Sequence, residues 1–201
     1  MSVKEKEETK AKIIAAAKEE FATYGFEKSS LRRISLKAGC TTGAIYFFFK
    51  DKDDLFCTIA NQILKPIQLA IHEHIANDKK NISFEPEFDE EIELADKLVD
   101  ILYSHYDESL ILLSKAAGSS LENISDLIVD ELEQEYGKLA HLYAKQEGKE
   151  VDEYMVHWLS HLYVEAYIHL VTNETDPKEA KKRTRKIMIF LVKGWLDCVL
   201  M

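Results

Sequence analysis

The chain of 201 residues contains few residues that break helices or cross-link loops: three prolines, seven glycines and three cysteines. With so few prolines and glycines beside 46% apolar residues, the composition favours an all-α fold. The cysteines, Cys40, Cys57 and Cys198, are odd in number and lack metal-type spacing. This pattern argues against a disulfide framework and indicates a reducing, cytoplasmic location.

Long apolar runs and the common catalytic motifs are missing as well. No apolar stretch approaches the about 18 residues of a membrane span, and the start, MSVKEKEETKAK, is too charged for a signal peptide. The sequence contains no H-E-x-x-H, no E-x-x-H pair, no G-x-x-x-x-G-K and no G-x-S-x-G. We therefore expect a protein that is not an enzyme, has no cofactor and does not contact the membrane.

Charge divides the chain into two parts. The net charge is −10, yet residues 1–55 hold eleven Lys and Arg against nine Asp and Glu, while the remainder holds 15 against 27. The acidic character therefore belongs to the second part. We expect an N-terminal module at residues 1–55 and a larger domain at residues 56–201.

Two short helical patterns meet at Gly39. Leu31 and Ile34 begin an amphipathic helix, and glycine suits the turn after it because it accepts a positive φ. Thr41 is a good N-cap for a second helix over residues 42–48. Ile45 and Phe49 should face the core. The outer face then carries Thr42, Gly43, Ala44, Tyr46 and Phe47, which is the pattern of a helix-turn-helix that enters the DNA major groove.

This stretch resembles the TetR family of transcriptional regulators. The matching positions are Ala38-Gly39, Gly43, Ile45-Tyr46, Phe49, Lys52 and Leu55, and an earlier helix from about Glu8 to Tyr24, stopped by Gly25-Phe26, also fits. The resemblance implies a three-helix DNA-binding domain followed by a larger helical domain for ligand binding and dimerisation. It also implies a sequence-specific regulator, most often a repressor released from a palindromic operator by a small molecule.

The expected DNA contacts follow from this match. The pair Phe47-Phe48 stands where the family often includes a histidine or tyrosine that bonds a phosphate. Phe48 cannot make that bond, so other side chains must hold the backbone. Because the module is only weakly basic, binding should be salt-sensitive and should need a dimer. The expected contact residues are Ser30, Arg32, Arg33, Thr41, Thr42, Gly43, Ala44, Tyr46, Phe47, Lys50 and Lys52.

Beyond residue 55 the resemblance concerns architecture. Asp51 should cap a helix running to about Ala76, in which Pro66 makes either a hinge or a static bend. The polar residues 77–91 predict a loop, and further helices are expected at about 90–105, 107–117, 121–145, 151–173 and 177–200. The resemblance implies a homodimer through the last two helices; the alternative is that their apolar faces fill the core of one subunit.

The resemblance also implies that an effector of unknown identity binds the second domain, and polar and aromatic residues mixed there with apolar ones suit such a pocket. An alternative reading makes most of these side chains core or surface aromatics. His157 and His161 lie one helical turn apart, but two ligands do not complete a metal site, so no metal is expected. Cys40 is either a small residue at a turn or a redox sensor. The candidate ligand-binding residues are Tyr103, Tyr106, Asn123, Tyr136, Tyr154, Trp158, His161 and Glu165.

Two other classes of function are compatible with the sequence. A helical interaction module without DNA binding would fit the acidic balance and Phe48, and an all-helical enzyme is a weaker alternative. Salt-dependent binding to duplex DNA would exclude the first, and turnover of a small molecule would support the second.

Overall fold

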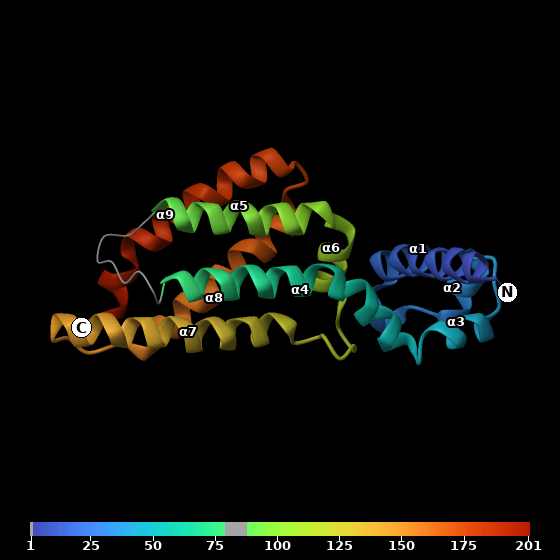
Figure 1. The fold of residues 1–201 in the computed structure, drawn as a ribbon, viewed down its shortest axis with the longest axis horizontal. Helices are drawn as coiled ribbons and strands as arrows, with labels where there is room; N and C mark the ends of the chain where they lie inside the picture. The colour runs from blue at the N-terminus through green and yellow to red at the C-terminus, as the bar shows by residue number, and fades with distance from the viewer. Residues whose placement is uncertain (1, 79–87) are drawn as a thin grey trace. The chain divides into compact units, whose positions relative to one another are not determined.

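The structure, a computed structural model, describes residues 2–78 and 88–201. The fold is all-α (Figure 1), as the composition predicts. The helices of the described residues are α1 (Val3–Lys28), α2 (Leu31–Lys37), α3 (Thr42–Phe48), α4 (Lys52–Asp78), α5 (Phe88–Ser104), α6 (Tyr106–Lys115), α7 (Ile124–Glu147), α8 (Glu153–Asn173) and α9 (Pro177–Val199).

The first helix begins earlier than the apolar pattern indicates. Ser2 and Glu5 form a capping box, in which the Glu5 amide donates to Ser2 Oγ at 3.3 Å and the Ser2 amide donates to Glu5 Oε2 at 2.7 Å. α1 therefore starts at Val3 rather than near Glu8. Gly25, with φ +71°, interrupts the helix where the sequence predicts that it stops.

The connection after α4 also differs from expectation. The sequence predicts a loop over residues 77–91, but α4 reaches Asp78 and α5 already begins at Phe88. Residues 79–87, with Pro86, lie outside the described residues. α4 continues through Pro66.

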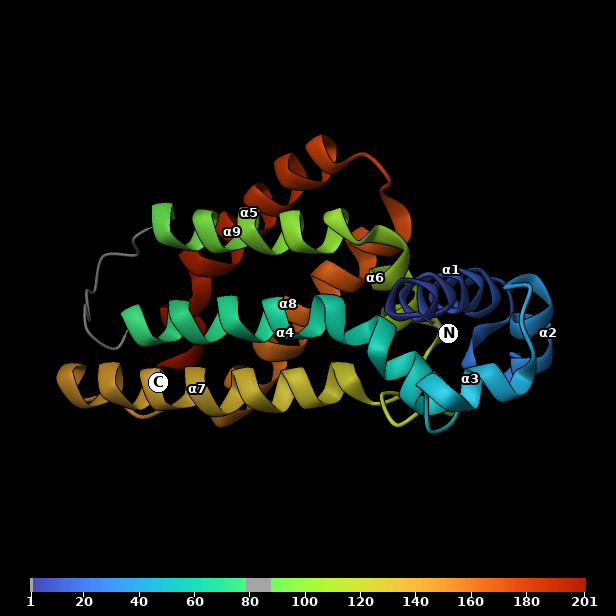
Figure 2. The ribbon, with the colours of Figure 1, turned by 45° about the vertical axis from the view of Figure 1, so that its right-hand side comes forward.

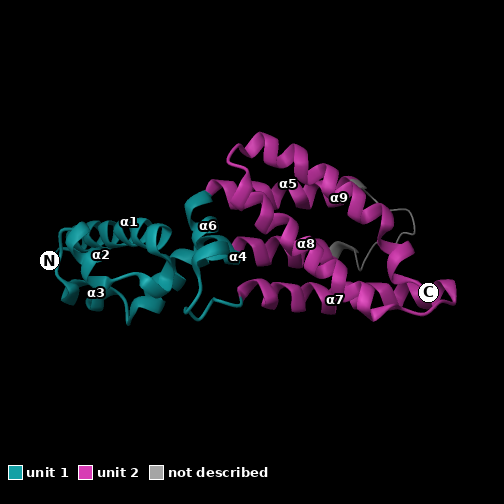
Figure 3. Cartoon of the chain, turned by 180° about the vertical axis from the view of Figure 1, so that it is seen from behind, with its two compact units in different colours: residues 1–65, 105–123 teal, residues 66–104, 124–201 magenta. Residues whose placement is uncertain are grey.

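The chain forms two compact units (Figure 3). Unit 1 contains residues 1–65 and 105–123, and unit 2 contains residues 66–104 and 124–201. The expected boundary after residue 55 thus differs, because the first part of α4 and all of α6 belong to unit 1. Ile111 and Ala116 are buried in the same apolar cluster as α1, which explains why α6 joins that unit.

Three phenylalanines form the centre of unit 1. The Phe56 ring meets the rings of Phe21 and Phe26 edge to face, with centroids 5.2 Å apart in both pairs. Such edge-to-face pairs add to the free energy gained from burial. On another side of α1, Lys18 forms an ion pair with the buried carboxylate of Glu108 on α6. The core and this pair together attach α6 to α1.

Unit 2 is a bundle in which α5, α4 and α7 run side by side (Figures 1 and 2). α5 packs against α9, and α8 packs against both α7 and α9. Trp195 of α9 contacts Tyr136 and Tyr143 of α7, with ring centroids 6.0 and 6.4 Å apart. A short antiparallel bridge between Val151 and Leu200 joins the end of α9 to the α7–α8 connection. Among the described residues, no helix is both long and apolar enough to cross a membrane.

Candidate functional site

The helix-turn-helix forms as the sequence predicts. α2 ends at Lys37 with Ala38 as its C-cap, and Gly39 adopts φ +65°, where an L-residue would be strained. Thr41 caps α3, since its Oγ1 accepts from the Ala44 amide at 3.2 Å. This turn fixes α3 beside α2 in unit 1.

The two faces of α3 differ sharply in burial. Ile45 is fully buried and Phe49, the C-cap residue, is almost so. Gly43, Tyr46 and Phe47 follow one another at the i, i+3, i+4 spacing and are exposed, Tyr46 to 57% and Phe47 to 64%. α3 therefore presents a glycine and two aromatic rings to solvent.

Threonine and alanine on α3 are less accessible than expected. The Thr42 hydroxyl lies 3.3 Å from the Ser35 hydroxyl of α2, and both Thr42 and Ala44 are half-buried. Their assignment as DNA contacts stays a prediction. The arrangement leaves the exposed rings as the more prominent groups on this face.

The cationic side chains that we expect to hold phosphates fall into two groups. Arg32 and Lys50 are exposed near the two ends of the helix-turn-helix. Arg33, which is also exposed, and Lys52, which is half-buried, make contacts inside unit 1. Arg33 Nε donates to Glu20 Oε1 at 2.7 Å, and this hydrogen bond raises the pKa of the guanidinium. Lys52 Nζ donates to Phe26 O at 2.7 Å and holds the end of α1.

The two hydroxyl residues expected to contact DNA near these cations, Ser30 and Thr41, differ in exposure and in hydrogen bonding. Ser30 precedes α2 as its N-cap residue, and its amide donates to Glu20 Oε1 at 2.9 Å. Its side chain makes no capping bond, and Ser30 is half-buried. Thr41 is exposed, although its hydroxyl caps α3.

Two lysines of α1 were missed by the sequence reasoning. Lys6 Nζ lies 5.2 Å from the centroid of the Phe47 ring, and Lys10 Nζ lies 5.7 Å from that of Phe49. Both lysines are exposed, so they add positive charge beside α3. The S-x-x-E signature of Ser2 and Glu5 could have revealed that α1 extends this far.

The comparisons with known proteins agree with this geometry. The family model described as "Bacterial regulatory proteins, tetR family" matches residues 13–58, which run from α1 into α4. Solved structures of transcriptional regulators share the fold over both units. Residues 13–58 therefore carry the DNA-binding domain of the TetR family.

Among these relatives, the HTH-type transcriptional repressor BepR of Brucella suis biovar 1 is 42% identical over 59 residues, which are 29% of this chain and 28% of BepR. The alignment thus spans less than a third of BepR. PfmR of Thermus thermophilus aligns with a TM-score of 0.63 at 18% identity, over 90% of this chain and 94% of PfmR. FadR of Bacillus subtilis, solved in complex with stearoyl-CoA, aligns with a TM-score of 0.60 at 17% identity, over 92% of this chain and 98% of FadR.

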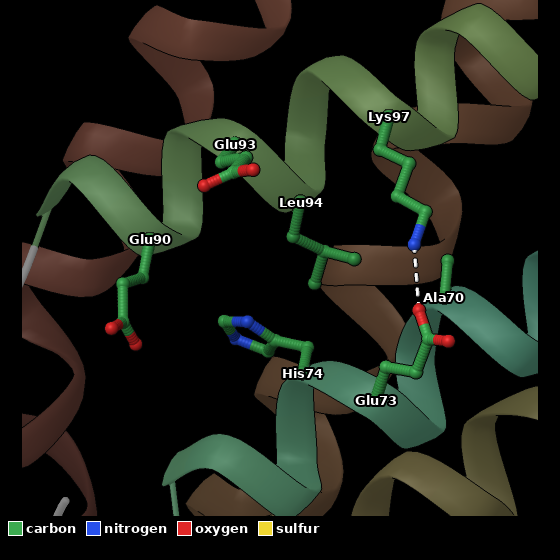
Figure 4. A pocket seen from close by; sticks show the side chains of 7 residues that line it. All are labelled: Ala70, Glu73, His74, Glu90, Glu93, Leu94 and Lys97. Atoms are coloured by element: carbon green, nitrogen blue, oxygen red, sulfur yellow. Dashed lines mark hydrogen bonds and ion pairs between the residues drawn. The ribbon is translucent and has the colours of Figure 1, made fainter.

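Unit 2 contains a polar pocket of about 260 Å³ between α4 and α5 (Figure 4). Lys97 Nζ donates to Glu73 Oε2 at 2.7 Å across it. His74 is buried, with its Nε2 3.1 Å from Glu91 Oε1. Sequence reasoning missed this pocket because its charged residues lie on helix faces that resemble solvated surface. Its lining residues are Ala70, Glu73, His74, Glu90, Glu93, Leu94 and Lys97.

None of the predicted ligand residues lines that pocket. Tyr154, Trp158 and Glu165 are exposed on α8, and His161 is half-buried there. Tyr106 and Asn123 belong to unit 1. The predicted ligand residues are thus divided between the two units, and their role stays a prediction.

The two remaining tyrosines of the set have structural contacts. The Tyr103 hydroxyl donates to the carbonyl oxygen of Glu174 at 2.8 Å, which ties α5 to the residue after α8. Tyr136 stacks on Tyr163, with ring centroids 5.7 Å apart. Their role in ligand binding stays a prediction.

The remaining candidates are the histidine pair, as part of a metal site, and Cys40 at the turn, as a redox sensor. His157 and His161 have ring centroids 4.6 Å apart, and His157 Nδ1 lies 2.7 Å from Glu133 Oε2. In residues 2–78 and 88–201, no group of three or more His, Cys, Asp or Glu side chains is placed to hold a metal ion. Burial raises the pKa of the Cys40 thiol, which lowers its reactivity as a nucleophile.

Proposed function

We propose that this TetR-family chain is a homodimeric, sequence-specific DNA-binding repressor that a small molecule releases from its operator. The observation that carries the proposal is the outward face of α3, where Gly43, Tyr46 and Phe47 stand exposed while Ile45 anchors the helix in unit 1. A recognition helix must present side chains to base edges and also be fixed by its own core.

The phosphate contacts are assigned to four exposed cations, while the guanidinium of Arg33, although exposed, bonds to Glu20. Arg32 and Lys50 from the helix-turn-helix and Lys6 and Lys10 from α1 have accessible ammonium or guanidinium groups. The Tyr46 hydroxyl, on an exposed ring, can donate to a phosphate oxygen. Since each subunit offers only a few such contacts, two subunits are needed for tight binding at physiological salt.

Exposed aromatic side chains on the last two helices support a dimer. Tyr154 and Trp158 on α8 are exposed to 71% and 46%, and Phe190 on α9 to 74%. Large apolar groups that project from neighbouring helices are typical of an interface between subunits. A two-fold axis through α8 and α9 would make the operator a pseudo-palindrome, with recognition helices about one DNA turn apart.

The effector would act through unit 2. Among the described residues, the pocket between α4 and α5 is lined by the carboxylates of Glu73, Glu90 and Glu93 and by the ammonium of Lys97. This balance would favour a small cationic effector over an anionic one. By linkage, an effector that weakens operator binding must itself bind the operator complex less tightly by the same factor.

The first experiment selects bound duplexes from a random DNA library with the purified protein at physiological salt. We expect an inverted repeat to be enriched, with binding that falls steeply as salt increases. The recovered operator then serves to screen effectors by competition, in which a releasing compound must bind the free protein more tightly than the complex. Absence of any enriched sequence would contradict the proposal and favour an interaction module.

A further inference from the structure

Phe47 is a phenylalanine exposed to solvent on the outward face of α3, close to the C-terminal end of the helix. Its ring is exposed to 64%, although a folded protein of this size could bury such a ring. Its neighbours on the surface are the exposed Tyr46 ring and the backbone of Gly43, one turn earlier. A Cβ on Gly43 would meet only Thr41 Oγ1, at 3.7 Å, so the surface beside Phe47 is open.

Two contacts define where this ring points. Phe48, which packs against the core of unit 1, meets it edge to face, with centroids 5.0 Å apart and an interplanar angle of 89°. On a ring face, Lys6 Nζ from α1 lies 5.2 Å from the centroid, within the range of a cation–π interaction. The ring is therefore held between a packed side chain and a cation from another helix.

A phenyl ring cannot make hydrogen bonds, so it can read only the apolar features of DNA. In the major groove, the 5-methyl group of thymine is the apolar group that distinguishes one base from the others. The half-buried Ala44 methyl and the Ser35-bonded Thr42 are less able to reach it. Gly43 permits the close approach that such a contact requires.

We propose that Phe47 determines sequence specificity by contacting a thymine methyl group in each half-site, and that Lys6 is a positioning residue for its ring. The proposal rests on the DNA-binding function proposed above and deepens it. The Lys6 ammonium is exposed on its other side, so the same group binds a neighbouring phosphate. Lys6 thus couples a backbone contact from α1 to base reading by α3.

The test replaces each thymine of the selected operator by uracil, which removes only the methyl group. We expect one uracil position per half-site to weaken wild-type binding about fourfold, as for the loss of one buried methyl group. The Phe47→Ala variant should bind the thymine and uracil operators with equal affinity. A Phe47→Ala variant that still distinguishes them would overturn the assignment, because its discrimination would come from another residue.

Lys6 is tested by Lys6→Gln and Lys6→Arg, with Lys12→Gln as the matched control. Lys12 is an exposed lysine of the same helix that lies on another face. We expect Lys6→Gln to reduce the methyl discrimination and to lower the slope of log affinity against log salt by about two for the dimer. Arginine should retain both properties, and Lys12→Gln should alter neither. Equal effects of the glutamine variants at the two positions would show that Lys6 acts by general charge alone.

Failure of this inference can be told apart from failure of the proposed function. A wild-type protein that enriches no DNA sequence would overturn both. A wild-type protein that enriches an inverted repeat, but shows no thymine position coupled to Phe47, would overturn only the reading by Phe47. Thermal unfolding of the Phe47 and Lys6 variants checks that each is folded, which is expected because both residues are exposed.

Discussion

Two phenylalanines of unit 1, Phe56 and Phe47, differ in burial, although nothing in their residue type distinguishes them. Phe56 is fully buried at the centre of the aromatic cluster, whereas Phe47 stands in solvent on α3. Burial of the first contributes to the free energy of folding. Exposure of the second leaves it free to contact a partner.

This contrast predicts different outcomes for the same substitution. Phe56→Ala should lower the free energy of unfolding by about 3–5 kcal/mol, because it removes buried ring contacts and leaves a cavity. Phe47→Ala should change it by no more than about 0.5 kcal/mol and should weaken operator binding. Urea unfolding and operator titration measure the two quantities. A large loss of stability in Phe47→Ala would show that its ring is part of the core.

Glu108 provides a residue whose contribution depends on pH. Burial is the largest single influence on its pKa and would raise it. The hydrogen bonds from Lys18 and from its own backbone amide, together with the charges of Lys18 and His105, outweigh burial, so the pKa lies below its ordinary value of 4.5. A lowered carboxyl pKa contributes stability that is complete above the pKa of the unfolded chain and is lost as pH falls through that of the folded chain.

We therefore expect Glu108→Gln to reduce the free energy of unfolding by about 1 kcal/mol at pH 7. The difference from wild type should shrink as pH falls below 4.5. Urea unfolding over this pH range checks the prediction, with Glu27→Gln as a control at an exposed position. A difference that persists unchanged at low pH would mean that packing, and not the charge, explains the effect.

At the scale of the element, the helix-turn-helix depends on two glycines with separate tasks. Gly39 has φ +65° and nothing within 4 Å of an added Cβ, so backbone conformation alone requires glycine there. Gly43 lies inside α3 with an ordinary helical backbone, and its open surface faces outward. The first glycine therefore serves the fold, and the second serves access to DNA.

Alanine at each position separates these tasks. Gly39→Ala should destabilise the protein by about 1–2 kcal/mol, the strain of a left-handed alanine. Gly43→Ala should raise stability by up to about 1 kcal/mol through helix propensity, yet it should weaken operator binding because the methyl group holds α3 away from the groove. Thermal unfolding and operator titration distinguish them. Unchanged operator affinity in Gly43→Ala would contradict the assignment of this face to DNA.

For the whole molecule, the weak positive charge of the DNA-binding module makes function depend on assembly. Residues 1–55 carry only two more basic than acidic side chains, and Arg33 and Lys52 use their charges within unit 1. A second subunit doubles the phosphate contacts and aligns two recognition helices.

We expect Phe190→Glu on α9 to convert the dimer into a monomer, since it would bury a charge at the interface. Operator affinity should fall at least about 100-fold at physiological salt when half of the contacts are lost. Sedimentation velocity and operator titration measure the two effects. Leu69→Glu, at an exposed leucine of α4, is the control and should stay dimeric. A Phe190→Glu protein that remains dimeric would place the interface elsewhere.

The sequence by itself determined the features that depend on local chemistry. Thr41 as N-cap, Gly39 at the turn and the bounds of α3 follow from residues a few positions apart. The capping box of Ser2 and Glu5 was equally local and could have been recognised. These features suffice for the all-α fold and the helix-turn-helix.

Only the tertiary structure decided which cationic side chains are available to bind DNA and which aromatic rings are held by contacts with other helices. The position of Lys6 beside Phe47, the use of Arg33 by Glu20, and the place of α6 in unit 1 all join residues that are distant along the chain. Periodicity shows which face of a helix is apolar, but not which helix covers it. That choice depends on the packing of all the helices at once, because the burial of each face is shared with its neighbours.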